Sequence, residues 1–200
     1  RVGLAALILW GVVRATGAAL PPRRVWRALL MMDCLNNAVP FTLFVLAQGQ
    51  ITGALASVLN AMTPIFTVLV AHVATSDEKL TPARGLGVLL GFAGVLVMLA
   101  HGGMGGTFWA LVACLGAAFS YALASVWGRR FRAAGLAPLA TAFGQLTASS
   151  ALMLPIWLAV DRPWALDWPG WEPVMAVVGL ASLSSALAYL IFFRILAEAG

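Results

Sequence analysis

Two asparagines stand four residues before a proline, in stretches that are otherwise almost entirely hydrocarbon. Asn36 precedes Pro40, and Asn60 precedes Pro64. A proline inside a helix lacks an N–H group, and its ring displaces the carbonyl oxygen four residues earlier. Each motif should therefore place a free carbonyl beside an amide side chain. Because an unsatisfied carbonyl in hydrocarbon is costly, water, a neighbouring helix or a bound small molecule must satisfy it.

Other polar side chains recur in the same stretches and could line one cavity with these motifs. From the first half of the chain, we expect the cavity to be lined by Asn36, Asn37, Asn60, Thr63 and Pro64. The second half could complete it with Ser120, Tyr121, Gln145, Ser182, Ser185 and Tyr189. The alternative is local repair, in which side chains of the same helix bind the free carbonyls and the helix bends mildly.

Asp33 lies in the same apolar stretch as Asn36, about seven residues or roughly 10 Å from its start. An acid at this depth in a membrane helix is a candidate for ion coupling, as a proton or cation site. The alternative is that it stays near the interface, where the helix N-terminus and an arginine stabilise its charge. Asp33 also begins a polar and aromatic stripe at helical spacing, which continues with Asn37, Phe41, Phe44 and Gln48.

The composition indicates that the elements carrying these residues are membrane helices. The chain is 62% hydrophobic and only 10% charged, whereas soluble domains carry about a quarter charged residues. A helix needs about 20 apolar residues to cross the hydrocarbon. Seven apolar segments can be marked, of which the first is short: Arg1–Val13, Trp26–Ala47, Ala54–Val73, Ala83–Ala100, Thr107–Trp127, Leu136–Val160 and Trp171–Phe193. Thr81 and Pro82 are typical of a helix start, as N-cap and first helical residue.

The basic residues predict the orientation of these segments. A net charge of +5 could indicate a nucleic-acid partner, but the charge is confined to alternate loops. One set of loops holds Arg14, Arg23, Arg24, Arg27, Lys79, Arg84, Arg129, Arg130, Arg132 and Arg194, and the other set holds only Arg1 and Arg162. Basic loops lie in the cytoplasm. We therefore expect residue 1 on the periplasmic side, residue 200 in the cytoplasm, and no nucleic-acid partner.

The sequence does not favour an enzyme or a metal site. His72 and His101 lie near segment ends, without an HExxH pattern. Cys34 and Cys114 lie inside apolar segments, which is typical of small buried residues. The serine clusters lack a supporting nucleophile motif, and hydroxyls in membrane helices usually bond to nearby carbonyls. We therefore expect no catalytic residue, metal or cofactor.

The stretch from Asn37 to Leu99 resembles the EamA-like branch of the drug/metabolite transporter superfamily. Its marks are "ASVLNAMTPIF" from Ala56 to Phe66, an acid in a short loop at Glu78, and a glycine-rich span from Gly87 to Leu96. "GLASLSSALAYLIFFRILAEAG" resembles the matching part of the second repeat. One departure is Asp77, which stands where the family usually has glycine. We expect Asp77 and Glu78 to be solvated loop acids.

The resemblance implies an all-α membrane protein, a multi-span bundle of two inverted five-helix repeats, truncated here at both ends. Residues 1–101 would be the first repeat without its first helix, and residues 107–200 the second repeat without its last two. "NAVPFTLF" and "SALAYLIF" are a weak internal echo of such a repeat.

The implied function is a secondary transporter of the bacterial inner membrane that exports small metabolites, amino acids or drug-like compounds by alternating access. Its partners would be a small-molecule substrate and the lipid bilayer. No nucleotide-binding motif is present. Two alternatives remain. A receptor or scaffold would have a dry, apolar centre, and a membrane enzyme would gather histidines or acids at one depth.

Overall fold

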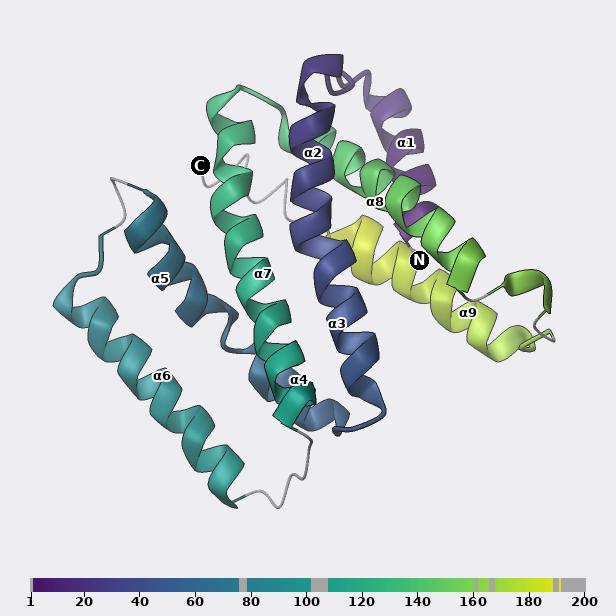
Figure 1. The fold of residues 1–200 in the computed structure, drawn as a ribbon. Coiled ribbons are helices and arrows are strands. Elements are labelled where there is room, and N and C mark those ends of the chain that lie inside the picture. The colour runs from purple at the N-terminus through teal and green to yellow at the C-terminus, as the bar shows by residue number, and fades with distance from the viewer. Residues whose placement is uncertain are drawn as a thin grey trace. The chain divides into compact units, whose positions relative to one another are not determined.

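The computed structural model describes residues 2–75, 79–101, 108–160, 162–165, 168–188 and 191, and the regular elements in these ranges are helices (Figure 1). The main helices are α1 Val2–Thr16, α2 Trp26–Asp33, α3 Val39–Gln48, α4 Gly53–Asn60, α5 Thr63–Ala74, α6 Pro82–His101, α7 Phe108–Ala133, α8 Pro138–Val160 and α9 Trp171–Gly179. Short 3-10 turns cover Arg23–Val25 and Pro163–Ala165, and π-helical segments cover Cys34–Ala38 and Leu180–Leu187.

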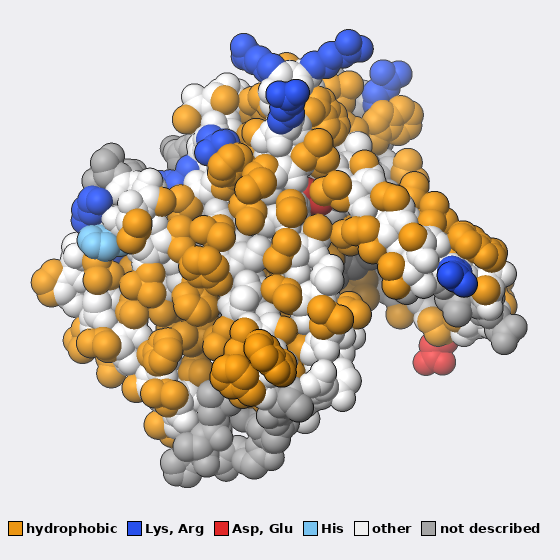
Figure 2. Space-filling view, viewed as in Figure 1, with side chains coloured by type: hydrophobic (Ala, Val, Ile, Leu, Met, Phe, Trp, Pro, Cys, Tyr) orange, Lys and Arg blue, Asp and Glu red, His pale blue; other side chains and the backbone are white. Residues whose placement is uncertain are grey.

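The seven predicted apolar segments correspond to seven helical stretches of the described chain. Four stretches are long and apolar enough to cross a membrane: Arg23–Gln48, Gly53–Ala74, Phe108–Phe131 and Pro138–Val160. Three shorter apolar helices cover Val2–Thr16, Pro82–Val97 and Trp171–Ser184. The visible surface is mostly hydrophobic (Figure 2), with large apolar side chains such as Leu86, Leu89 and Leu90 exposed along α6. This surface suits lipid as its solvent.

Local signals in the sequence set several helix boundaries. Helix α6 begins at Pro82, and the Arg84 N–H group donates to Thr81 Oγ1 at 3.3 Å. The predicted cap at Thr81 is therefore confirmed. Thr52 caps α4 in the same way, because its hydroxyl accepts from the Leu55 N–H group at 3.3 Å.

The chain forms two compact units, which we describe separately. Unit 1 comprises Arg1–Cys34 and Arg130–Gly200, and unit 2 comprises Leu35–Arg129. These units are sets of residues in contact, and they do not follow the predicted repeats at residues 1–101 and 107–200. The division into inverted repeats therefore stays a prediction.

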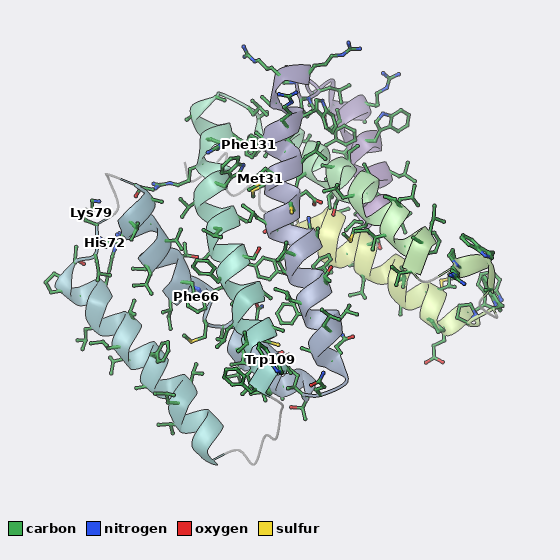
Figure 3. All side chains as sticks on the ribbon, viewed as in Figure 1. Met31, Phe66, His72, Lys79, Trp109 and Phe131 are labelled. Atoms are coloured by element: carbon green, nitrogen blue, oxygen red, sulfur yellow. The ribbon has the colours of Figure 1, made fainter. Side chains whose placement is uncertain are left out.

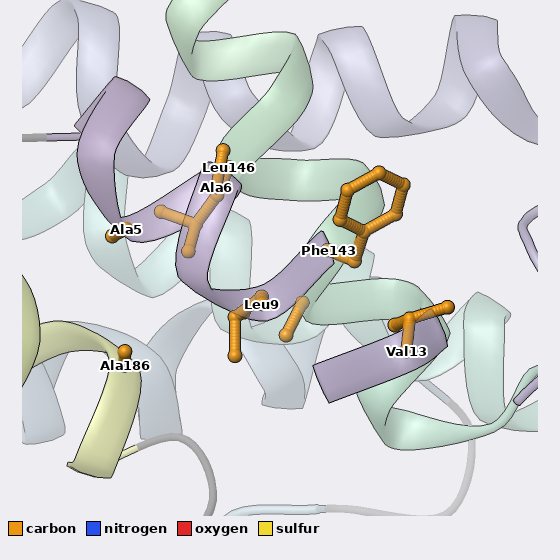
Figure 4. Packing of buried hydrophobic residues seen from close by; sticks show 8 residues of the cluster. Ala5, Ala6, Leu9, Val13, Phe143, Leu146 and Ala186 are labelled. Atoms are coloured by element: carbon orange, nitrogen blue, oxygen red, sulfur yellow. The ribbon is translucent and has the colours of Figure 1, made fainter. Parts of the chain in front are cut away.

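In unit 1, α8 packs against both α1 and α2. The start of α1 lies beside the middle of α8, since a Cβ added at Gly3 would lie 3.7 Å from Ser150 Oγ. Figure 4 shows the opposite end of this contact, with Val13 beside Phe143. The two helices therefore run antiparallel over a core of Ala5, Ala6, Leu9, Val13, Ala142, Phe143, Leu146 and Ala186.

The contact between α2 and α8 depends on a glycine. A Cβ added at Gly144 would lie 2.7 Å from Leu29 Cδ1 and 3.0 Å from Pro21 Cγ. A larger residue would therefore push α2 away from α8. Small residues allow this kind of close approach between membrane helices.

In unit 2, a second core joins α3, α4 and α7 through Ala47, Leu55, Leu59, Ala110 and Cys114. Phe66 of α5 and Phe119 of α7 add an edge-to-face ring contact, with centroids 5.7 Å apart and planes at 87°. Cys114 is buried and Cys34 is half-buried, and both are free thiols. The expected burial is therefore confirmed for Cys114, whereas Cys34 is only partly buried.

Four basic side chains lie together at one end of unit 1. Arg14, Arg23, Arg24 and Arg27 surround the connection between α1 and α2, where Figure 2 shows blue side chains gathered. In unit 2, Figure 3 shows Lys79 at the opposite end from Trp109. Both arrangements fit the predicted topology, in which basic loops share the cytoplasmic side.

Candidate functional site

A cavity of about 490 Å³ lies in unit 2, between the end of α3 and the length of α4. It is lined by Phe44, Gln48, Ile51, Thr52, Gly53, Ala56, Ser57 and Asn60. This volume is within the range of about 300 to 1,000 Å³ that is typical of small-molecule sites. The lining combines two amides and two hydroxyls with an aromatic ring, and it contains no charged side chain.

The depth of the cavity follows from the position of its residues on α4. Thr52 and Gly53 lie where the chain enters α4, and Asn60 is its last residue. Seven residues separate Gly53 from Asn60, which is roughly 10 Å along a helix axis. Asn60 therefore lies near the middle of the Gly53–Ala74 span, and the cavity reaches it from the connection between α3 and α4.

The two hydroxyls of the lining serve the backbone of their own helix. Thr52 Oγ1 accepts from the Leu55 N–H group, and Ser57 Oγ donates to the Gly53 carbonyl at 2.9 Å. The amides of Gln48 and Asn60 can both donate and accept hydrogen bonds. These two amides are therefore the main polar groups that the cavity offers to a ligand, with Phe44 and Ile51 as its apolar wall.

The Asn60–Pro64 motif interrupts its helix. Helix α4 ends at Asn60, Ala61 and Met62 form a turn, and α5 begins at Thr63. Thr63 Oγ1 donates to the Asn60 carbonyl at 2.7 Å and lies 3.4 Å from Asn60 Oδ1. The carbonyl that Pro64 displaces is therefore satisfied locally, while the Asn60 side chain lines the cavity. Thr63 and Pro64 are not among the lining residues.

The Asn36–Pro40 motif has a different structure. The helix continues through a π-helical turn over Cys34–Ala38, directly before Pro40. Ser120 of α7 donates from Oγ to the carbonyl of Leu35 at 2.7 Å. A neighbouring helix therefore satisfies a carbonyl of this turn. Such π adjustments are a known way to accommodate a proline in a membrane helix.

The other predicted residues of unit 2 lie around this turn rather than in the cavity. Asn36 and Tyr121 are half-buried, and Asn37 is 8% exposed. Ser120 is 4% exposed, and its hydroxyl is used by the Leu35 carbonyl. Among the predicted binding residues, Asn60 alone belongs to the described lining of this cavity.

The remaining predictions fall in unit 1 or outside the described residues. Asp33 and Gln145 are buried in unit 1. Ser182 donates to the Val178 carbonyl at 2.7 Å. Tyr189 lies outside the described residues, as does the side chain of Ser185. A central cavity that joins both sets of residues stays a prediction.

Sequence reasoning missed Gln48, Thr52 and Ser57. Gln48 and Phe44 did belong to the stripe that begins at Asp33, so a signal for them was present. The hairpin between α3 and α4 brings this stripe beside the start of α4. The sequence does not show that α3 and α4 lie side by side, because a polar stripe on one helix does not identify the helix that faces it.

No group of three or more histidines, cysteines or acids gathers within the described ranges.

His72 accepts two hydrogen bonds from the connection between α5 and α6. Its Nδ1 atom accepts from the Leu80 N–H group at 2.9 Å, and Lys79 Nζ donates to the His72 carbonyl at 3.0 Å (Figure 3). Asp77 and Glu78, which lie between these partners, are outside the described residues.

Comparison with known proteins identifies the family. The chain matches the EamA-like transporter family over residues 1–100. It is 26% identical over 185 residues to YedA, an uncharacterized inner membrane transporter, of Escherichia coli strain K12 and of Escherichia coli O157:H7. These matches cover 92% of this chain and 59% of each relative. No solved structure matches it significantly. The apolar helices and these matches make the chain a multi-pass inner-membrane protein that belongs to the EamA-like transporter family.

Proposed function

We propose that the chain is part of a secondary transporter that exports small uncharged or zwitterionic compounds, such as neutral metabolites, amino acids or drug-like amphiphiles. The cavity at α3 and α4 carries this proposal. Burying a charge without a partner is costly, and the cavity has no charged side chain to pair with a strongly ionic substrate. Its amides and its aromatic wall suit a ligand with hydrogen-bonding groups on an apolar body.

The start of α4 supports amino acids among these substrates. Thr52 and Gly53, which begin this helix, are part of the cavity wall. The first N–H groups of a helix have no partner within the helix and carry partial positive charge. A carboxylate in the cavity could therefore be stabilised without a basic side chain.

For the mechanism, we propose alternating access between two inverted repeats, residues 1–101 and 107–200. In this arrangement a central site would be exposed to each side in turn as one half rocks against the other. The predicted orientation places the connection between α3 and α4 on the periplasmic side. The cavity would then be the outward vestibule, and Asn60 would lie at its inner end.

The polar lining also distinguishes this proposal from a receptor or scaffold. A protein that only packs or signals through its helices has no reason to keep two amides at a cavity in hydrocarbon, where unsatisfied polar groups are costly. Asn60 lies at mid-span and is one of the residues that line the cavity. This placement favours a ligand that hydrogen-bonds at that depth.

Cysteine accessibility tests the site. Cys34 and Cys114 are first replaced by alanine in the intact protein, and single cysteines are then introduced as Asn60→Cys and Leu59→Cys. Asn60 lines the cavity, whereas its neighbour Leu59 is buried in the core of unit 2. A water-soluble thiol reagent should label the first variant and not the second. Equal labelling of both, or none of either, would contradict the cavity.

Transport measurements test the function. The intact protein in inside-out vesicles should accumulate at least one compound from a panel of amino acids and neutral metabolites. Asn60→Leu should lower that accumulation by about tenfold or more, since it removes a polar contact worth roughly 1.4 kcal/mol. The same compound should protect the Asn60→Cys variant from labelling. Accumulation that Asn60→Leu and Gln48→Leu leave unchanged would place the substrate elsewhere.

A further inference from the structure

Two buried polar groups of α8 in unit 1 have atoms with no hydrogen-bond partner among the described residues. They are the Gln145 amide nitrogen, Nε2, and the Ser149 hydroxyl, Oγ. Gln145 is 4% exposed and Ser149 is 0% exposed. Most buried polar groups in proteins are hydrogen-bonded, and leaving one unsatisfied costs about 1 to 3 kcal/mol. These two groups therefore need a ligand that the helix itself does not supply.

Ser149 differs from every other hydroxyl of its helix. Thr141, Thr147 and Ser150 each donate to the carbonyl four residues earlier, at 3.2, 2.7 and 2.8 Å. This local bond is the ordinary way to satisfy a hydroxyl in a membrane helix. The Ser149 hydroxyl does not make it, although the same carbonyl position is available to it. The Ser149 hydroxyl is therefore left for a partner away from the α8 backbone.

A buried carboxylate lies on the helix that packs against α8 at this level. Leu29 of α2 meets Gly144 of α8, and both helices run downward from the upper part of the view in Figure 1. Asp33 is four residues beyond Leu29, and Ser149 is five beyond Gly144. Both are therefore at a similar depth, roughly 6 to 8 Å further along their helices, with Asp33 on the Leu29 face of α2 and Gln145 directly after Gly144 on α8. Asp33 is 0% exposed, so this part of unit 1 combines one carboxylate with an amide and a hydroxyl.

The chemistry of these groups fits a small monovalent cation. Carboxylate, hydroxyl and amide oxygens are hard ligands, which favour alkali and alkaline-earth ions over transition metals. One carboxylate balances a single positive charge, whereas calcium sites usually contain several carboxylates. With no hydrogen bond at Nε2 to set its direction, the Gln145 amide can turn its oxygen toward a cation.

We propose that Asp33, Gln145 and Ser149 form a sodium-binding site in unit 1. A single Na⁺ would bind the Asp33 carboxylate in addition to the interaction that this residue already makes, and it would accept lone pairs from Ser149 Oγ and Gln145 Oε1. The use of this ion to drive substrate movement rests on the proposed transport function. Binding of Na⁺ does not depend on that function, so the binding site and the transport function can be disproved separately.

The test is direct binding of radiolabelled Na⁺ to the intact protein in detergent, at constant pH and ionic strength with choline as the replacing cation. Binding should saturate, and Na⁺ should raise the melting temperature by about 3 °C or more at saturation. Ser149→Ala should weaken Na⁺ affinity by about tenfold or more. Because the hydroxyl has no bond to lose, this variant should melt no lower than the parent protein without Na⁺.

Ser150→Ala is the matched control, since it removes a hydroxyl from the next residue, where the bond is to the Leu146 carbonyl. It should keep the full response to Na⁺. Asp33→Asn, which removes the charge, should abolish binding, and Gln145→Leu should weaken it. Absence of saturable Na⁺ binding in the parent protein would overturn the site. An equal change in Na⁺ affinity in the Ser149→Ala and Ser150→Ala variants would also overturn it. A melting temperature that depends on pH and not on Na⁺ would overturn it too, and would indicate a proton or a buried water at these groups.

Discussion

The same five-residue motif, Asn-x-x-x-Pro, has two different structures in unit 2. At Asn36–Pro40 the helix continues through a π-helical turn, and Ser120 of another helix binds the Leu35 carbonyl. At Asn60–Pro64 the helix stops and restarts, and Thr63 binds the Asn60 carbonyl from within the motif. The two motifs also differ in the residue before each proline. Thr63 has a hydroxyl that reaches the carbonyl three residues earlier, whereas the corresponding Val39 has none.

This comparison shows how a proline in a membrane helix is accommodated. A local hydroxyl lets the chain break sharply, and the break leaves the asparagine side chain at the end of a helix, beside a cavity. Without a local hydroxyl, the helix stays continuous and depends on a neighbour. A carbonyl close to the proline accepts a side-chain hydrogen bond in both places, that of Leu35 in the first and that of Asn60 in the second. Only the second place also has an asparagine beside a cavity.

The largest expected effect on stability is at Ser120. Ser120→Ala removes the donor for the part-buried Leu35 carbonyl in a continuous helix, and leaving such a group unsatisfied costs about 1 to 3 kcal/mol. The measurement is the free energy of unfolding in mixed micelles. Ser125→Ala is the control on the same helix, because its exposed hydroxyl serves only the Tyr121 carbonyl. If both substitutions cost the same, the contact between Ser120 and Leu35 does not stabilise the π-helical turn.

The two asparagines should differ in transport. Asn60→Leu should lower transport about tenfold, or roughly 1.4 kcal/mol, while Asn36→Leu should lower it less than about threefold, or roughly 0.6 kcal/mol. The reason is that Asn60 lines the cavity and Asn36 does not. Initial rates at equal amounts of protein in the membrane check this. Equal losses would instead support the predicted central cavity that includes Asn36.

Thr63→Val should destabilise the protein by about 1 kcal/mol, less than Ser120→Ala. Thr63 is only half-buried, so water can replace part of its bond to the Asn60 carbonyl. Thr67→Val is the control, since its hydroxyl bonds to the Thr63 carbonyl within a regular helix. If Thr63→Val lowers the free energy of unfolding more than Ser120→Ala does, the predicted order of the two contacts is wrong.

The smallest effect is expected at Thr52. Thr52→Ala removes the N-cap of α4 and should cost about 0.5 to 1 kcal/mol, since the cap is exposed to the cavity. Thr52→Ser keeps the hydroxyl and should restore most of this stability. Thermal unfolding of the two variants beside the parent protein measures the difference. Identical melting temperatures would show that the α4 cap does not contribute.

The sequence by itself determined the membrane environment, the helical segments and several of their boundaries. These properties follow from composition and from local patterns. The cap at Thr81 and Pro82 needs only neighbouring residues, and the burial of Cys114 follows from its apolar surroundings. The family resemblance rests on motifs of the same local kind, such as the stretch from Ala56 to Phe66, and the family match confirms it.

Only the tertiary structure decided which partner each polar group has. Ser120 and Leu35 are 85 residues apart, and nothing in either segment predicts their hydrogen bond. Asn60 could be assigned to a cavity from its motif, but Gln48 joins it only because α3 and α4 form a hairpin. The burial of Ser149 depends on how α8 packs in unit 1. In an apolar sequence the faces of different helices resemble one another. Tertiary packing alone therefore determines which helix face lies against a given polar residue.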